Sequence, residues 1–109
     1  MRNFQTTVLD TFRDVSGPYA TEPFEAGWAQ EATFFVRVHR TDEGTRSVPV
    51  AVQVSVDGLS WVDEGTHANV PTDRDGFVRV RHFGGWLRLM VDVPPEVSCN
   101  LSIWIVLKE

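Results

Sequence analysis

The stretch SVPVAVQVSVDGLSW, residues 47–61, decides the fold class of this chain. Its first ten residues carry a valine at every second position, namely Val48, Val50, Val52, Val54 and Val56. Side chains of a β-strand alternate between the two faces of a sheet, so this spacing predicts a strand with one apolar, buried face. The pair Asp57-Gly58 is typical of a turn and predicts that the strand ends there. Trp61 is then expected to open the next strand and to pack over the edge of the sheets.

The same alternation recurs along most of the chain. It is clear in segments 31–40, 77–83, 86–93 and 99–108, and weaker in 3–12. The connections carry turn residues, among them Asp63-Glu64-Gly65 and Gly84-Gly85. Residues 13–30 show no sustained period and are expected to form a long connection with at most one short strand. Short strands at regular spacing predict an all-β, antiparallel β-sandwich that is jelly-roll-like.

Length and charge narrow the possible functions. The chain has 109 residues, which predicts a single domain over residues 1–109 with a core that needs no disulfides. The net charge of −5 provides no overall attraction to nucleic acid or to anionic membranes, so we expect neither as a partner. The first residues lack the apolar run of a signal peptide, and no segment approaches the length of a membrane-spanning helix. We therefore expect synthesis in the cytoplasm without a signal peptide.

The sequence also argues against catalysis. Ser60 lies in GLSWV, which has Val62 where a nucleophile elbow needs its second glycine. The single cysteine, Cys99, falls on the apolar face of its segment and is expected to be buried and unreactive. We expect a protein that is not an enzyme and has no catalytic residues.

No metal or cofactor is expected either. The three histidines lie far apart in the sequence, without the spacing of a zinc site: His39, His67 and His82. The segment TDRDGF (72–77) matches part of a calcium loop, but the corresponding first and twelfth positions hold Pro71 and His82 and not oxygen ligands. An acidic turn is the simpler interpretation.

One predicted surface is unusual. If Gly84-Gly85 forms a two-residue hairpin turn, segments 77–83 and 86–93 pair with each other. Two arginines then lie directly opposite each other, which weakens a hairpin unless carboxylates from a neighbouring strand, from residues 13–30 or from another subunit compensate. The last segment adds a second, partly apolar outward strip. The candidate interface residues are Phe83, Trp86, Arg79, Arg81, Arg88, Met90 and Trp104.

Three explanations of this surface remain open. In the first, the N-terminal segment of the same chain covers Phe83 and Trp86. In the second, another subunit covers them, since tryptophan, methionine and arginine are enriched in protein–protein interfaces. In the third, Trp86 or Trp104 stacks on a sugar ring.

The pattern S-x-D-G-x-x-W at 55–61, followed by R-L-x-V at 88–91, resembles a feature of small β-sandwich and jelly-roll structural proteins of phage or prophage type. It is also similar to discoidin-like and carbohydrate-binding modules, although discoidin-like domains are typically longer and often disulfide-linked. The first resemblance implies a self-assembling, non-catalytic component of a virion, shell or fibre, with copies of itself or other structural subunits as partners. The alternative is a carbohydrate-binding module whose surface aromatics hold a glycan.

Overall fold

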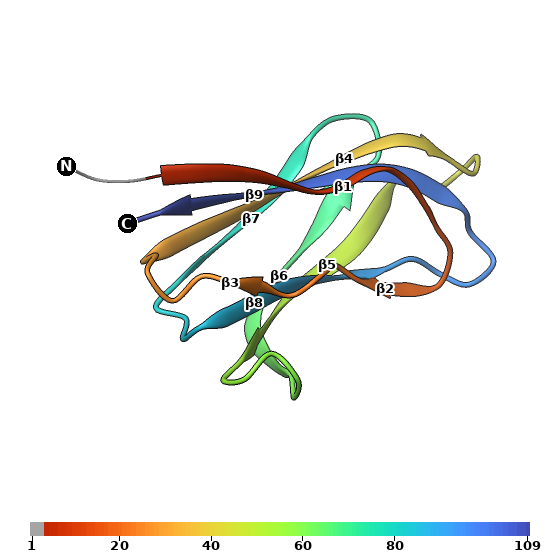
Figure 1. Cartoon of the computed structure of the whole chain (residues 1–109). Helices are drawn as coiled ribbons and strands as arrows, with labels where there is room; N and C mark the ends of the chain where they lie inside the picture. The colour runs from red at the N-terminus through yellow and green to blue at the C-terminus, as the bar shows by residue number, and fades with distance from the viewer. Residues whose placement is uncertain (1–3) are drawn as a thin grey trace.

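The chain folds into two antiparallel sheets packed face to face (Figure 1). The computed structural model describes residues 4–109; the first three residues of the predicted domain 1–109 lie outside the described residues. The strands are β1 (Phe4–Val15), β2 (Pro18–Ala20), β3 (Phe24–Glu25), β4 (Glu31–Thr41), β5 (Ser47–Ser55), β6 (Val62–Pro71), β7 (Gly76–Arg81), β8 (Trp86–Asp92) and β9 (Cys99–Lys108). The predicted all-β sandwich is confirmed.

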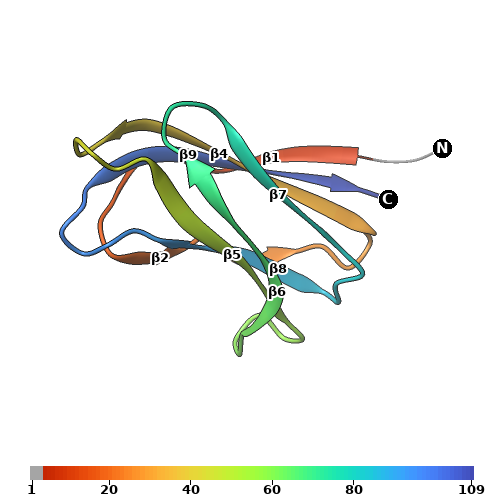
Figure 2. The same cartoon turned by 180° about the vertical axis from the view of Figure 1, so that it is seen from behind.

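The strand order is that of a jelly roll. One sheet, here sheet A, has the order β1-β9-β4-β7, and the other, sheet B, has the order β2-β8-β5-β6, with β3 also paired to β8. The view from behind shows the same two sheets as separate layers (Figure 2). With β2 and β3 counted as one interrupted strand, this is the eight-strand order of two Greek keys. Within residues 4–109, β5 and β6 are the one pair of consecutive strands that form a hairpin.

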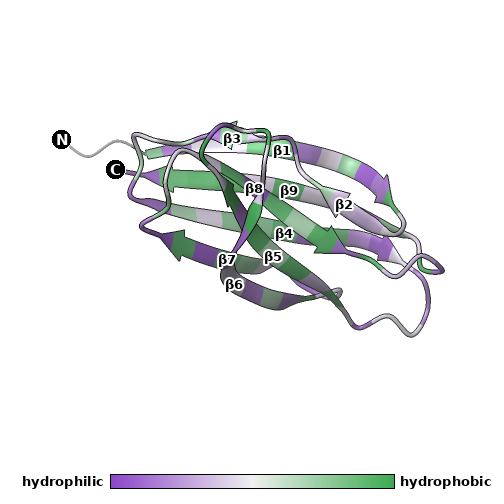
Figure 3. Ribbon diagram, turned by 90° about the horizontal axis from the view of Figure 1, so that it is seen from below, coloured by the Kyte–Doolittle hydropathy of each residue, from purple (hydrophilic) through white to green (hydrophobic). Residues whose placement is uncertain are grey.

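Alternate side chains fill the space between the sheets. The bands of apolar and polar residues along the strands are visible in Figure 3. Phe34 and Leu101 of sheet A and Val52 and Leu89 of sheet B have no exposed surface. Full burial of one such side chain stabilises the fold by about 1.5–3 kcal/mol, so the alternation supplies the main driving force. Residues 4–109 contain no helix with the length and hydropathy needed to cross a bilayer.

The predicted valine face holds for most of β5 but fails at its end. Val48, Val50 and Val52 are buried and Val54 is partly buried, whereas Val56 is 92% exposed. The strand ends at Ser55, whose Oγ accepts hydrogen bonds from the backbone N–H groups of residues 57 and 58. The chain turns one residue earlier than the valine pattern predicts.

The predicted hairpin of 77–83 with 86–93 is wrong. β7 belongs to sheet A and pairs with β4, whereas β8 belongs to sheet B and pairs with β5. Gly84-Gly85 therefore lies in a crossing between the two sheets. Val80 and Leu89 do share one core, but they reach it from opposite layers. Alternation shows which residues face inward and does not distinguish a neighbour within a sheet from a partner across the core.

Two further predictions need correction. Asp63-Glu64-Gly65 is not a turn but lies inside β6, where the pairing register with β5 shifts between Ala51 and Gln53. This bulge uses Gly65, whose φ of +109° suits glycine. Residues 13–30 were predicted to contain at most one short strand, but they contain two, since both β2 and β3 pair with β8. The weak alternation of residues 3–12 does mark a strand, β1.

Candidate functional site

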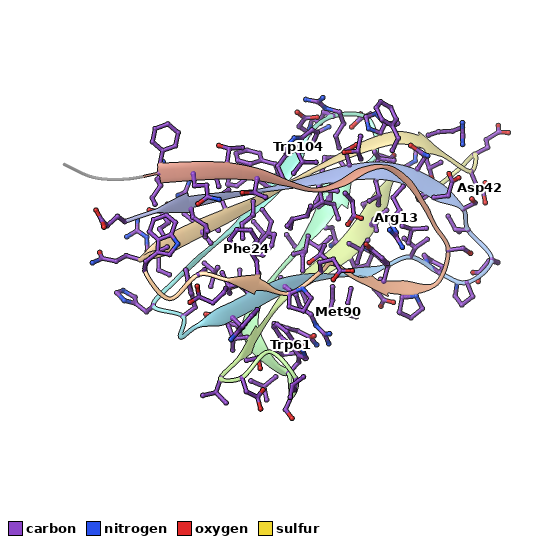
Figure 4. All side chains as sticks on the ribbon, in the orientation of Figure 1. Arg13, Phe24, Asp42, Trp61, Met90 and Trp104 are labelled. Atoms are coloured by element: carbon purple, nitrogen blue, oxygen red, sulfur yellow. The ribbon has the colours of Figure 1, made fainter. Side chains whose placement is uncertain are left out.

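The predicted interface residues lie on two opposite faces of the sandwich. Strand registers and burial place Arg79, Arg81 and Trp104 on the outer face of sheet A, and Trp86, Arg88 and Met90 on the outer face of sheet B. Figure 4 shows Trp104 on one face and Met90 on the other. The seventh residue, Phe83, lies in the crossing and packs against the core. The single patch expected from the hairpin register is therefore not formed.

The like-charge contacts of the predicted hairpin disappear with it. Arg79 and Arg81 both contact Glu31 of β4, with N···O distances of 3.1 and 3.7 Å. On the other face, Arg88 donates to Gln53 Oε1 at 2.7 Å, and its guanidinium lies 4.5 Å from the ring centre of Trp61. A carboxylate from a neighbouring strand thus compensates the two arginines of β7, which is one of the sources that the sequence suggested.

Trp61 lies beside the start of the next strand, as expected, but it packs on the outer face of sheet B and not over the edge of the sheets. It immediately precedes β6, which is the edge strand of sheet B, and it is half-buried on the outer face under Arg88. Figure 4 shows it on the same side of the molecule as Met90. It contributes to the surface of the sandwich and not to its interior.

A row of apolar side chains crosses the whole outer face of sheet A. Phe35 of β4 is the register partner of both Phe77 of β7 and Trp104 of β9, and Trp104 is in turn the partner of Val8 of β1. We call Phe77, Phe35, Trp104 and Val8 the aromatic row. The ring centres of Phe35 and Phe77 are 5.9 Å apart. Phe77 and Val8 are each 53% exposed, and Phe35 is 37% exposed.

Other apolar groups extend this row. Phe4 is exposed at one end of β1, and Phe12 is exposed further along the same strand, where its ring stacks on His39 at 4.0 Å. Exposed apolar side chains gathered on one face of a domain often mark an interaction site. Trp104 is one of the interface residues predicted from the sequence, whereas Phe35 and Phe77 are not, because the pairing of β4 with both β7 and β9 cannot be read from alternation.

Positive side chains flank the aromatic row. The guanidinium of Arg37 lies 5.0 Å from the ring centre of Trp104, and that of Arg79 lies 5.7 Å from Phe77. Arg37 also donates two hydrogen bonds of 2.8 Å to Asp75. This contact lowers the pKa of Asp75 and raises that of Arg37. The contact therefore favours the charged form of both groups.

The outer face of sheet B is hollowed at its centre. The hollow has a volume of about 390 Å³, and its lining includes Ala51 of β5, Met90 of β8 and His67 of β6. Asp63 and Asp92 also line it. Its lining combines apolar groups with carboxylates.

One pair of residues could suggest catalysis but is covered. His39 Nε2 lies 2.8 Å from Ser102 Oγ, a contact typical of an activated serine. However, Ser102 is buried, and its Oγ also accepts a hydrogen bond of 2.9 Å from the backbone N–H of Phe12. The ring of Phe12 stacks on His39. These contacts hold the irregular part of β1 in place and leave no access to the hydroxyl.

The remaining candidate chemistry is limited. Cys99 is buried, as its alternation predicted. In the part of the chain that the structure describes, no three histidine, cysteine, aspartate or glutamate side chains come together as metal ligands.

A buried polar contact joins the two sheets. Asp10 of β1 is almost completely buried, and the hydroxyl of Tyr19 of β2 lies 2.8 Å from both of its carboxylate oxygens. Burial, and then the hydrogen bond to Asp10, raise the pKa of Tyr19 to about 12. The guanidinium of Arg13 covers the ring of Tyr19 at 4.7 Å and lies 3.5 Å from Asp10. The contact stabilises β1 in a region where its register shifts twice.

Together, the two sheets and their order define a β-sandwich protein of jelly-roll topology with an apolar outer face. No protein-family model matches the sequence, and no curated protein matches it either. Solved structures do match its fold. The SPBc2 prophage-derived protein YomS superposes with a TM-score of 0.67 at 8% identity, covering 100% of this chain and 96% of that one.

Two further structures have the same kind of fold. A chain from Bacillus endospore appendages, which form disulfide-linked pili, matches with a TM-score of 0.57 and 11% identity over 97% of this chain and 84% of that one. The CBM36-1 domain of a multidomain xylanase from the hindgut metagenome of Trinervitermes trinervoides matches with a TM-score of 0.52 and 8% identity over 95% and 96%. At such identities the similarity shows the fold alone.

Proposed function

We propose that this protein is a non-catalytic structural subunit that assembles with copies of itself into a particle, shell or fibre of phage or prophage type. The observation that carries the proposal is the aromatic row, which crosses all four strands of sheet A and leaves Phe77 and Val8 more than half exposed. The fold similarity to a prophage protein and to a pilus structure supports the same class.

The face of sheet A is a better contact surface than the sheet edges. Exposed edge strands can pair with other chains, and bulges or inward charges are common ways to prevent this. β1 has two register shifts and the inward carboxylate of Asp10, while β6 has a bulge at Gly65 and ends at Pro71. Both of these edges are therefore poorly suited to strand addition.

The area of this face approaches that of a specific contact. Four strands about 4.8 Å apart, with about ten residues each at about 3.3 Å per residue, cover roughly 600 Å² in projection. A specific interface buries about 800 Å² of accessible surface on each partner, and accessible area exceeds projected area. Sheet A can supply most of one such interface by itself.

Light scattering of the purified protein over a range of concentrations tests the proposal. We expect a defined oligomer that the double substitution Phe35→Ser and Phe77→Ser disrupts without changing the far-ultraviolet circular dichroism. Val56→Ser is the matched control, because Val56 is apolar and 92% exposed but lies outside sheet A. A wild-type protein that stays monomeric at every concentration would contradict the proposal. So would a double variant that assembles like the wild type.

A second candidate function is carbohydrate binding, which the Trp61–Arg88 stack on sheet B favours together with the fold similarity to a carbohydrate-binding module. Stacked indole and guanidinium groups offer a flat surface with hydrogen-bond donors, which suits a sugar ring. Titration of the tryptophan fluorescence with soluble polysaccharides should then produce a saturable shift that Trp61→Ala removes. Absence of a shift with every polysaccharide would exclude this function.

A further inference from the structure

We propose that the assembly is head-to-tail, with the aromatic row of one copy packed against the hollowed face of sheet B on the next copy. This inference rests on the proposed function and adds the identity of the partner surface. The two surfaces lie on opposite sides of the sandwich, as the positions of Trp104 and Met90 show (Figure 4). Charge and shape both support the pairing.

The outer faces of the two sheets have opposite charge. On sheet A the outward carboxylate of Glu31 is shared by two arginines, so that positive charge is in excess there. The basic residues of this face are Arg37, Arg40, Arg79, Arg81 and Lys108, and its acidic residues are Asp14, Glu31 and Asp75.

Carboxylates dominate the outer face of sheet B. Asp63 accepts a hydrogen bond of 3.0 Å from the neutral amide of Gln53, and among residues 4–109 neither Asp63 nor Asp92 forms a salt bridge. Glu25 of β3 adds a third carboxylate, as the register partner of Trp86. Arg88 is the cation of this face, and it is stacked on Trp61.

This asymmetry favours unlike faces in contact. Two copies that met through sheet A would bring together two surfaces with an excess of the same sign, and like charges that face each other across an interface repel. A contact of sheet A with sheet B pairs opposite signs instead. The arginines of β7 then approach the carboxylates of Asp63 and Asp92.

The shapes are also complementary. The hollow of about 390 Å³ around Ala51 and Met90 is large enough for an aromatic ring, since a cavity of about 150 Å³ holds benzene. Phe77 is the most suitable group to enter it, because it lies at the β7 end of the aromatic row, is 53% exposed, and has Arg79 beside it. Arg79 would then face the carboxylates that line the hollow.

A contact between different faces does not close on itself in a dimer. Each copy keeps one face of each kind open, so that the contact generates a ring if the rotation closes and a filament if it does not. The geometry therefore predicts growth beyond two subunits, which a symmetric contact through sheet A alone would not allow.

Complementary variants test this arrangement. Phe77→Ser removes the projecting ring from sheet A, and Ala51→Arg fills the hollow of sheet B and adds a positive charge. Each variant alone should be monomeric, with the dissociation constant raised by about thirtyfold or more, as for an interface hot spot. An equimolar mixture should form a dimer and stop there, since it contains one intact pair of faces. Sedimentation velocity measures all three samples.

The other outcomes separate this inference from the proposed function. If Ala51→Arg assembles like the wild type while Phe77→Ser does not, sheet B is not the partner surface, although assembly through sheet A stands. If the mixture stays monomeric, the head-to-tail arrangement is wrong. If the wild type itself is monomeric, both proposals fail.

A charge exchange provides a second test if Ala51→Arg perturbs the fold. Asp92 is exposed, so Asp92→Arg leaves the core intact. It should weaken assembly about tenfold or more, and a mixture with Arg79→Asp should restore binding between the two variants. Weakening without any restoration in the mixture would overturn the proposed pairing.

Discussion

Replacement of Tyr19 by phenylalanine tests the polar contact that joins the two sheets. The substitution removes the hydroxyl that lies 2.8 Å from both carboxylate oxygens of Asp10, and Asp10 is almost completely buried. A hydrogen bond to a charged group contributes about 1.5–3 kcal/mol. The remaining contact with Arg13, at 3.5 Å and from a half-exposed guanidinium, offsets little of this loss. We expect Tyr19→Phe to lower the free energy of unfolding by about 2 kcal/mol and the melting temperature by about 9 °C.

The same contact makes wild-type stability depend on pH in the alkaline range. The pKa of Tyr19 rises from 10.0 to about 12 on folding, so the folded state retains a proton that the unfolded state loses between these values. The contribution is therefore fully present below pH 10.0 and is lost as the pH rises toward 12. Two pKa units correspond to about 2.7 kcal/mol, which solvent access to the partly exposed ring reduces to roughly 1–2 kcal/mol.

Urea unfolding of both proteins at a series of pH values measures these effects. The stability difference between wild type and Tyr19→Phe should be constant below about pH 10 and shrink above it. Because the chain has one tyrosine, the ultraviolet absorbance of tyrosinate reports its ionisation directly in the folded protein. A loss below about 0.5 kcal/mol at neutral pH, or ionisation of folded Tyr19 near its ordinary pKa, would refute the reasoning.

Three other predictions concern a turn glycine, a core leucine and a turn aspartate. Gly58→Ala should lower the free energy of unfolding by about 1–2 kcal/mol because of the φ of +80° at Gly58, and by more because the added Cβ would lie 3.1 Å from the Trp86 ring. Gly44→Ala is the control, because Gly44 has a φ of +89° but lies in open space and should show the backbone cost alone. Equal losses of the two variants in urea unfolding would exclude the Trp86 contact. Leu89→Ala should lower the free energy of unfolding by about 2–5 kcal/mol, because Leu89 is fully buried, and a loss under 1 kcal/mol would contradict the packing described here. Backbone N–H groups lower the pKa of Asp57, so the contribution of Asp57 to stability is present above its unfolded pKa and is lost in acid. The urea midpoints of wild type and Asp57→Ala should therefore converge as the pH falls from about 5 to about 2. A constant difference between the midpoints would contradict this role of Asp57.

Much of the fold was predictable because the residues that face the core can be recognised from the local sequence alone. The alternate valines of β5 and the apolar residues of β9 follow the two-residue period of a strand. A shift of the strand register by one residue would turn all of these side chains toward solvent. The exception, Val56, shows the limit of the pattern. The hydroxyl oxygen of Ser55 accepts hydrogen bonds from the backbone N–H groups of residues 57 and 58. This local contact ends the strand before the last residue of the valine pattern.

The outer surface was less predictable because it depends on which strands are neighbours. Phe35 and Phe77 are 42 positions apart, and they meet because β4 and β7 pair within sheet A. The short connection Gly84-Gly85 suggested a hairpin, but in a jelly roll the chain crosses between sheets at such a connection. Residues predicted to form one patch are consequently separated by the thickness of the sandwich, while the aromatic row was not anticipated as a unit.

The pairing of β1 with β9 has a consequence for biosynthesis. During translation the residues of β1 leave the ribosome before their ladder partners, residues 99–108, which are about 90 positions later. At about 5–20 residues per second, the nascent β1 waits roughly 5–18 s with Phe4, Val8 and Phe12 accessible to other chains. The polar side chains of Asp10, Arg13 and Asp14 would make this waiting segment a poor template for premature association between neighbouring polysomal chains.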